Sequence, residues 1–276
     1  MTIFKRGIRK RNLIDALQAN DFWKAIISDP SLFVGIRNNY INAYYNGNNI
    51  CKLKYNPREN RLIGEVHHKY LMQEKPTGSY YVDIFRKPTA DCLSTILSIK
   101  QASTKYAGVE KTGVHAVCMN EADVLDVEIA FTRCHPPIHG RTGELDRLDY
   151  LKLEMQNGKP MLVFYEAKTI ANSEIKAKDR PHVLDQMDGY TKTLTGHANE
   201  IVRSYNMVCD NIRELRIRRK GNLIGMVQNN LTVDNIDDLP RLIIFGYDKS
   251  KESSSWGGHY EKLKNELGNR VILRED

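Results

Sequence analysis

Asp149, Glu166 and Lys168 are the residues whose types and spacing in this chain suggest chemistry. They flank the dipeptide Asn157-Gly158, which predicts a two-residue turn because a type I′ turn needs positive φ at both central positions. In such a hairpin the numbers of opposed residues have a constant sum, so Asp149 is expected opposite Glu166, with Lys168 on the same face. The sequence therefore predicts two carboxylates and one amine at one end of a hairpin.

Two carboxylates that face each other across a β-ladder destabilise it unless something compensates their charge. A divalent cation is one such compensator, since Mg²⁺ prefers hard oxygen ligands, polarises a phosphate and lowers the pKa of a bound water. Lys168 would then activate the water or neutralise charge. A cation held by two carboxylates and assisted by a lysine is the arrangement that metal-dependent phosphodiester hydrolysis needs. The alternative is a salt-bridge cluster at an exposed strand end, the commoner origin of such an isolated group.

Apolar periodicity predicts the elements that must position these groups. The hairpin strands are expected over residues 148–155 and 160–169, after a strand over 124–131 whose alternation sets Asp126 and Glu128 opposite its apolar face. Glu128 is either a further acid of the metal site or a solvated residue of the strand. The second role is favoured because half-buried strands usually expose their acids. The other core elements are expected as a helix over 89–105, a helix carrying Gln186, helical residues up to about Arg219, a buried strand over 241–247, a helix over 259–267 and a strand over 270–273.

The order of these residues resembles the PD-(D/E)xK, or restriction-endonuclease-like, superfamily of nucleases. The order is Asp149, then Glu166-Ala167-Lys168 on the next strand, then Gln186 and Tyr190 on a helix. The resemblance extends over about residues 124–248. It implies an α/β fold whose restriction-endonuclease-like core has the order α-β-β-β-α-β, with a mixed sheet flanked by helices.

The resemblance also implies roles for individual residues. Asp149, Glu166 and the backbone carbonyl of Ala167 would hold Mg²⁺, with Mn²⁺ as a substitute. Lys168 would assist the attacking water, and Gln186 would position water or a phosphate.

One part of the resemblance places the metal-binding aspartate differently. Residues 143–149 are similar to the run before the metal-binding strand in RecB-like members, in which the aspartate would match Asp146. Asp146 and Asp149 are an odd number of positions apart, so in a continuous strand they project from opposite faces. The hairpin register favours Asp149, unless an odd-length loop or a bulge intervenes. Tyr190 matches a Gln-x-x-x-Tyr element of the same members, but its spacing with apolar neighbours predicts core packing.

Basic residues predict a polyanionic partner. The net charge is +7 and the pI about 9.0, which suits nucleic acid, with DNA expected ahead of RNA. Lys176, Lys178 and Arg180 follow the Glu-x-Lys triplet and are expected to face the nucleic-acid backbone. The basic run from Arg213 to Lys220 either grips phosphates or complements the dipole of a helix end, and the sequence does not decide between these.

Two domains are expected, an N-terminal module over residues 1–87 and the nuclease-like core over 88–276. The module begins with a helix over residues 12–28, which Asp29-Pro30 ends. A β-meander is expected to follow over residues 32–45 and 50–55.

Composition narrows the classes of protein. Five cysteines without paired-ligand spacing argue against a disulfide framework, and the stretch Cys134–His139 is favoured as a plain loop over a zinc site. No run approaches about 18 apolar residues, so no membrane span is expected. The N-terminus lacks the apolar run of a signal peptide, which predicts a cytoplasmic protein, and a homodimer is left open.

Three functional hypotheses follow. The first is a Mg²⁺-dependent endo- or exonuclease, with a role in DNA repair, restriction or phage defence. The second is a catalytically inactive relative that keeps the fold and binds nucleic acid or a partner protein. The third is an enzyme of another class, for which the sequence offers neither a glycine-rich phosphate loop nor a nucleophile elbow.

Overall fold

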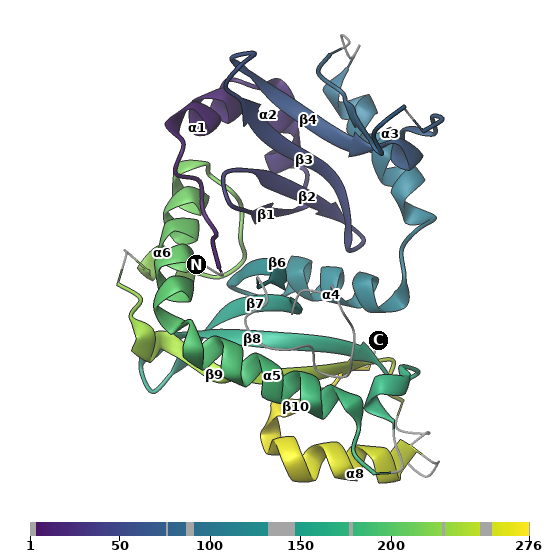
Figure 1. The fold of residues 1–276 in the computed structure, drawn as a ribbon, viewed down its shortest axis with the longest axis vertical. Coiled ribbons are helices and arrows are strands. Elements are labelled where there is room, and N and C mark those ends of the chain that lie inside the picture. The colour runs from purple at the N-terminus through teal and green to yellow at the C-terminus, as the bar shows by residue number, and fades with distance from the viewer. Residues whose placement is uncertain are drawn as a thin grey trace. The chain divides into compact units, whose positions relative to one another are not determined.

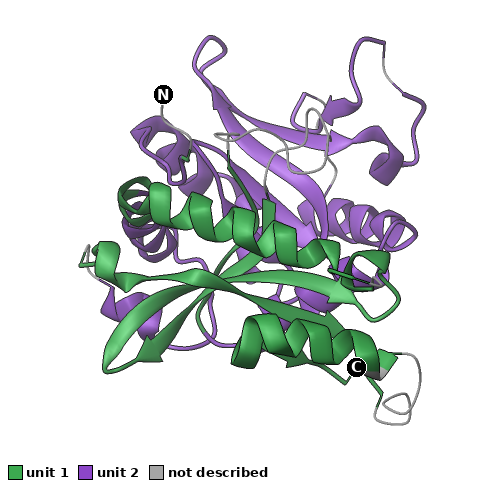
Figure 2. Ribbon diagram, turned by 60° about the horizontal axis from the view of Figure 1, so that its bottom comes forward, with its two compact units in different colours: residues 1–4, 123–203, 230–276 green, residues 5–122, 204–229 purple. Residues whose placement is uncertain are grey.

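The computed structural model describes residues 4–75, 77–86, 91–131, 147–176, 179–227, 230–248 and 256–275. The described chain contains two sheets of five strands each together with α-helices, which confirms the predicted α/β class. It divides into two compact units, residues 1–4, 123–203 and 230–276 in unit 1 and residues 5–122 and 204–229 in unit 2 (Figure 2). Within the described residues, no helix is both long and apolar enough to cross a membrane.

Unit 2 is built on an antiparallel meander with the strand order β1-β2-β3-β4-β5. Its strands are β1 (Phe33–Ile36), β2 (Ile41–Tyr45), β3 (Asn48–Asn56), β4 (Arg61–His67) and β5 (Tyr81–Asp83). The first three confirm the predicted meander, whereas β4 and β5 were not anticipated from the sequence. A short 3₁₀ helix, η1 (His68–Leu71), follows β4.

The prediction of a single N-terminal helix over residues 12–28 is wrong, because two helices occupy that stretch. α1 (Arg11–Gln18) and α2 (Asp21–Ser28) are separated at Asn20, whose backbone is extended with φ −97° and ψ 126°. The Asn20 side chain accepts a hydrogen bond from the Trp23 N–H and so caps the second helix.

Two further helices lie in unit 2 after the meander. α3 (Cys92–Thr104) confirms the predicted helix and begins at Asp91, whose carboxylate accepts hydrogen bonds from the Leu93 and Ser94 N–H groups. α4 (Val109–Asn120) was not predicted. Both belong to the compact unit of the first sheet, whereas the sequence placed them with residues 88–276. The boundary at 87/88 stays a prediction.

Unit 1 is built on a mixed sheet with the strand order β10-β9-β8-β7-β6 (Figure 1). Strands β6, β7 and β8 are antiparallel, while β9 runs parallel to β8 and β10 parallel to β9. The strands are β6 (Val124–Ala130), β7 (Arg147–Gln156), β8 (Lys159–Thr169), β9 (Ile236–Phe245) and β10 (Val271–Leu273). The helices of unit 1 after β8 are η3 (Ser173–Ile175), α5 (His182–Gly196), the start of α6 (Ala198–Glu214), η4 (Val233–Asn235), α8 (Trp256–Leu267) and η6 (Gly268–Arg270). The rest of α6 and α7 (Leu223–Met226) belong to unit 2. α5 packs against β9 and α8 against β10.

The β7–β8 hairpin has the predicted register. Asn157 and Gly158 adopt φ of 50° and 77°, as a two-residue turn with positive φ requires. The pairs run from Gln156↔Lys159 to Tyr150↔Tyr165, with a constant sum of residue numbers. The turn chemistry therefore sets which side chains of the two strands share a face.

Strand β6 departs from the strict alternation expected of it. The register with β7 shifts between Val124 and Asp126, and Glu128 has a positive φ of 48°. Asp126 is consequently 1% exposed rather than solvated, and its carboxylate accepts a hydrogen bond from the Val127 N–H at 2.8 Å. A bulge moves a side chain from one face to the other, which periodicity alone cannot show.

Candidate functional site

The charged end of the β7–β8 hairpin lies just beyond its last paired residues. The register that pairs Tyr150 with Tyr165, carried one residue further, sets Asp149 against Glu166. The Asp149 carboxylate accepts a hydrogen bond from the Ala167 N–H, with 2.7 Å between Oδ2 and N. Asp149 thus reaches the strand segment that carries the other two predicted residues.

Lys168 forms ion pairs with one carboxylate of β8 and one of η3. Its Nζ lies 2.7 Å from Glu166 Oε1 and 2.8 Å from Glu174 Oε2. The Glu166 and Lys168 side chains are 5% and 8% exposed. These two side chains are therefore buried, whereas Glu174 is 22% exposed and Asp149 is partly exposed. A salt-bridge cluster stays an alternative to a metal site. Buried charges persist where they are paired, because each loses its hydration on burial.

The acids around Lys168 determine its protonation. Burial acts to lower the pKa of the ammonium group, but Glu166 and Glu174 outweigh it and hold the pKa above its ordinary value of 10.5. Lys168 is therefore a cation at neutral pH. It can neutralise negative charge or donate a proton in a hydrogen bond, whereas a protonated amine cannot take a proton from water.

Glu174 is a member of this cluster that the sequence did not assign. It lies in η3, five residues after β8, and the Asn172 side chain accepts a hydrogen bond from its N–H at 2.9 Å. This asparagine turn bends the chain back so that the Glu174 carboxylate reaches Lys168. The signal was present in the sequence as Asn172, three residues after the strand, but the sequence does not show which side chain Glu174 meets after the turn.

Helix α5 carries Gln186, the predicted residue for a water or phosphate. Its Oε1 is buried and has no hydrogen-bond partner among the described residues. A buried carbonyl oxygen without a partner is uncommon and is usually satisfied by a water or a ligand. The apolar face of the same helix packs as predicted, because Val183, Met187 and Leu194 are at most 1% exposed. Tyr190 is also buried, and its hydroxyl donates to the Arg147 carbonyl at 2.8 Å.

The predicted nucleic-acid-binding residues have different surroundings. Lys176 is exposed, and Lys178 lies outside the described residues. Arg180 contacts three carboxylates, at 2.7 Å from Asp188, 3.1 Å from Asp185 and 3.4 Å from Glu266. A phosphate at Arg180 would have to compete with these acids.

Two arginines of the basic run from Arg213 to Lys220 donate hydrogen bonds to backbone carbonyls of unit 2. Arg213 donates to the Ile224 carbonyl at 3.3 Å and to that of Val227. Arg219 donates to the Val34 carbonyl and lies 4.0 Å over the Phe33 ring. These contacts give both arginines a structural use.

Glu128 and Asp146 were the open choices for a further or alternative acid. Glu128 is partly exposed and lies 3.7 Å from Arg147 in an ion pair. Asp146 lies outside the described residues, as do Cys134, His135 and His139. Among the residues that the structure describes, no three histidine, cysteine, aspartate or glutamate side chains are grouped as ligands of one ion.

A second charged network occupies the other face of the same hairpin. Glu154 accepts a hydrogen bond from the Tyr165 hydroxyl and lies 2.6 Å from Arg241 and 3.1 Å from Lys152. The Tyr165 ring stacks on Tyr150 with centroids 4.4 Å apart. Sequence reasoning missed this network because Arg241 reaches Tyr165 through the parallel β8–β9 pairing, which joins distant parts of the chain.

Comparisons of the chain with protein-family models, with curated proteins and with solved structures give no match. The site is therefore interpreted from its own residues and their surroundings.

Proposed function

We propose that the protein is a metal-dependent nuclease that hydrolyses phosphodiester bonds, with DNA as the favoured substrate. The observation that carries the proposal is the convergence of three predicted residues on one buried strand segment. The Asp149 carboxylate is bound at the Ala167 N–H, between Glu166 and Lys168, and Lys168 is 2.7 Å from Glu166. A hairpin register set by a turn, rather than chance surface proximity, produces this arrangement.

The connections of unit 1 support the same proposal. Three antiparallel strands, β6, β7 and β8, are followed within unit 1 by α5 and the start of α6. The chain passes through residues 204–229 of unit 2 before β9, which runs parallel to β8. This is the β-β-β-α-β part of the order that the resemblance to PD-(D/E)xK nucleases implies. A restriction-endonuclease-like core is therefore part of the proposal.

The donor set suits a hard divalent cation. Asp149, Glu166 and the Ala167 carbonyl would hold Mg²⁺ or Mn²⁺ through oxygen atoms, as these ions prefer. The ion would polarise the scissile phosphate and lower the pKa of a bound water. The surroundings fit this use because the Lys168 ammonium group is shared between two carboxylates and the Asp149 carboxylate lies at the Ala167 N–H beside them. An added cation would relieve the repulsion among these acids.

Lys168 and Gln186 would act directly on the substrate or its water. As a cation, Lys168 would stabilise the negative charge that develops on the phosphate in the transition state. The buried Oε1 of Gln186 offers an acceptor that could orient a water molecule. The attacking water would need another proton acceptor, because Lys168 holds its own proton.

A role in DNA repair, restriction or phage defence and a cytoplasmic location accord with this activity and remain proposals with it. The second candidate function is an inactive relative that binds nucleic acid or a protein. Its supporting observation is that Lys168 is already bonded to two acids and Asp149 to a backbone N–H, as in a purely structural cluster.

A metal-dependent cleavage assay separates the two. Labelled single-stranded and duplex DNA and RNA are incubated with the protein in EDTA, Mg²⁺ or Mn²⁺. We expect cleavage in the presence of metal and its loss in Lys168→Ala, with nucleic-acid binding largely kept because phosphate contacts sum over a basic surface. Lys152→Ala is the matched control, since it removes a lysine from the other face of the same hairpin.

Equal cleavage by the wild type and Lys168→Ala would contradict the role given to Lys168, and no cleavage of any substrate with either metal would contradict the nuclease. Binding without cleavage would leave the inactive relative as the better account.

A further inference from the structure

A group of aromatic rings and lysines gathers where β4 ends and β5 begins. His67 pairs with Tyr81 across these strands, and the His68 N–H donates to the Tyr80 carbonyl at 2.9 Å. The group, called the aromatic patch below, consists of His67, His68, Tyr70, Tyr80, Tyr81 and Tyr106 with Lys69 and Lys75. All of it lies in unit 2, outside the unit that holds Asp149.

The rings of the patch contact one another as a connected set. His67 stacks on His68 with centroids 4.7 Å apart and an interplanar angle of 27°. Tyr81 meets His67 edge to face at 5.5 Å, and Tyr80 lies 5.8 Å from His67. Flat side chains arranged in this way offer several stacking surfaces to one ligand.

The outer rings of the patch are exposed to solvent. Tyr80 and Tyr81 are each 54% exposed and Tyr106 is 48% exposed. Large aromatic side chains on a surface lose their contact with water only when a partner covers them, and a group of them marks an interaction site. A partner with flat apolar faces would gain most from these rings.

Both lysines lie over tyrosine rings of the patch. Lys75 Nζ is 3.7 Å from the Tyr80 centroid, and Lys69 Nζ is 4.4 Å from that of Tyr106. These cation–π contacts are the interactions that the structure gives the two ammonium groups within its described residues. They disfavour a cationic ligand, because the protein already places its own cations over the rings.

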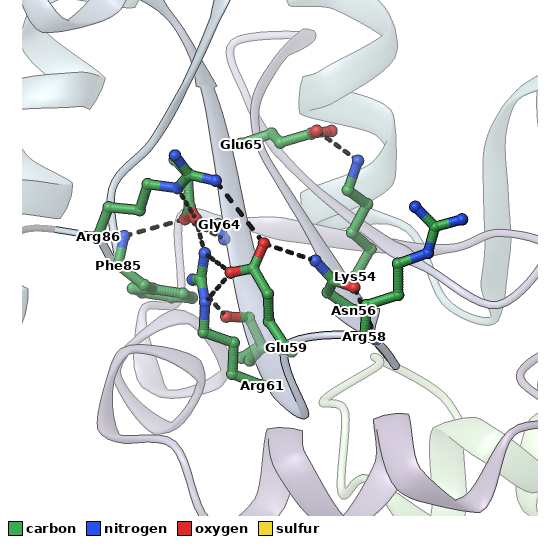
Figure 3. Close-up of polar contacts among 11 residues, drawn as sticks. Lys54, Asn56, Arg58, Glu59, Arg61, Gly64, Glu65, Phe85 and Arg86 are labelled. Atoms are coloured by element: carbon green, nitrogen blue, oxygen red, sulfur yellow. Dashed lines mark hydrogen bonds and ion pairs between the residues drawn. The ribbon is translucent and has the colours of Figure 1, made fainter.

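The acids on and beside the neighbouring strands form ion pairs with other cations. Arg61 lies 2.7 Å from Asp83 and 2.6 Å from Glu59, and Lys54 pairs with Glu65 (Figure 3). Their negative charge is thereby balanced locally. Glu74, beside Lys75 in the chain, is the exposed acid within the segment that joins η1 to β5. The patch therefore presents rings together with ammonium groups.

We propose that the aromatic patch binds single-stranded DNA by stacking unpaired bases on its exposed tyrosines while Lys69 and Lys75 contact the phosphates. Unpaired bases offer the flat faces that the rings need, and the phosphates complement the lysines. In duplex DNA the bases stack on each other and their faces are not accessible. The choice of DNA rests on the proposed nuclease function. The proposed stacking of bases rests on the rings and lysines of the patch and is independent of that function.

Binding is tested without cleavage by working in EDTA. Fluorescence anisotropy measures the dissociation constants of a labelled oligothymidylate of about 20 nucleotides and a duplex of equal length. We expect tighter binding of the single strand, and a loss of about five-fold or more for Tyr80→Ala and for Tyr81→Ala. Tyr81→Phe keeps the ring and should bind as the wild type does.

Tyr260→Ala is the matched control, because Lys264 lies 5.8 Å over the Tyr260 ring on α8, which belongs to unit 1 and not to the patch. Thermal unfolding of each variant shows that exposed tyrosines were replaced without loss of the fold. The proposal is overturned if the duplex binds as tightly as the single strand, if the alanine variants bind like the wild type, or if anionic lipid vesicles bind to the patch and the oligonucleotide does not.

The two proposals fail separately. Cleavage of DNA with unchanged single-strand binding in Tyr80→Ala and Tyr81→Ala would refute the patch and keep the nuclease. Tyrosine-dependent binding of the single strand without cleavage in any metal would keep the patch and refute the nuclease.

Discussion

The two faces of the β7–β8 hairpin carry different arrangements of charge. On one face Lys168 lies between the carboxylates of Glu166 and Glu174. On the other face Glu154 is bonded by Lys152, Arg241 and the Tyr165 hydroxyl, and Arg241 also lies 3.5 Å from Asp237. Strand alternation keeps the two groups apart although they occupy the same pair of strands.

The difference indicates which face has capacity for a further cation. Glu154 already has two cationic partners and a hydroxyl donor, so its negative charge is well compensated. On the Lys168 face, the ammonium group is shared by two carboxylates, and the Asp149 carboxylate lies at the Ala167 N–H, which adds a third acid close to them. We therefore assign chemistry to the first face and stability to the second.

Removing one carboxylate from each face should produce the largest contrast. Glu166→Gln is expected to reduce metal-dependent cleavage by about 100-fold or more, because loss of a metal ligand removes several kcal/mol of transition-state stabilisation. Glu154→Gln should keep cleavage but lower the free energy of unfolding by about 1–3 kcal/mol, since Lys152 and Arg241 lose their shared anion.

Cleavage rates and urea unfolding of both variants measure this contrast. Glu59→Gln is the control for stability, because Glu59 forms an exposed ion pair with Arg61 and such pairs contribute about 1 kcal/mol or less. If Glu154→Gln destroyed activity in folded protein while Glu166→Gln kept it, the assignment of the two faces would be reversed.

The two faces should also lose stability at opposite ends of the pH scale. The acids around Lys168 outweigh its burial and raise its pKa in the folded protein. Its contribution to the free energy of unfolding is therefore complete below pH 10.5 and is lost as the pH rises through the folded pKa. For Glu154, burial is outweighed by Tyr165, Lys152 and Arg241, which lower its folded pKa. The contribution of Glu154 to the free energy of unfolding is complete above pH 4.5 and is lost as the pH falls through the folded pKa.

Urea unfolding across pH, compared between wild type, Lys168→Met and Glu154→Gln, tests the two signs. The difference between wild type and Lys168→Met should shrink in alkaline solution as the lysine loses its proton, and that for Glu154→Gln should shrink in acid as the glutamate gains one. A difference for Lys168→Met that does not fall as pH rises above 10.5 would show that the lysine pKa is not raised.

The hairpin and its register were predictable because a two-residue turn is a local rule. Asn157 and Gly158 both need positive φ, and the pairing follows from the turn by counting. Core strands and the buried face of α5 followed from periodicity in the same way. In β6 the predicted apolar face is buried, but Asp126 is buried as well, in a strand where the register shifts and Glu128 has a φ of 48°.

Contacts between distant segments were not predictable from the sequence. Glu174 reaches Lys168 through a turn at Asn172, and Arg241 reaches Glu154 across a parallel strand pair. The aromatic patch depends on the pairing of His67 with Tyr81 after an intervening 3₁₀ helix. Each of these needs knowledge of where the chain returns, which neither propensity nor periodicity contains.

The central claim is that Asp149 and Glu166 belong to a metal site, and the metal dependence of stability tests it most directly. Asp149→Asn removes the charge but keeps an oxygen for the Ala167 N–H, so the backbone contact survives the substitution. Differential scanning calorimetry of both proteins is run in EDTA and in Mg²⁺ or Mn²⁺.

For the wild type we expect metal to raise the thermal midpoint, with a stabilisation of about 1–3 kcal/mol at tens to hundreds of times the dissociation constant. Asp149→Asn should show no response to metal and should equal or exceed the wild type in stability without it, because it deletes a like-charge contact. A wild type indifferent to both metals, together with a destabilised Asp149→Asn, would contradict the metal site and identify the cluster as structural.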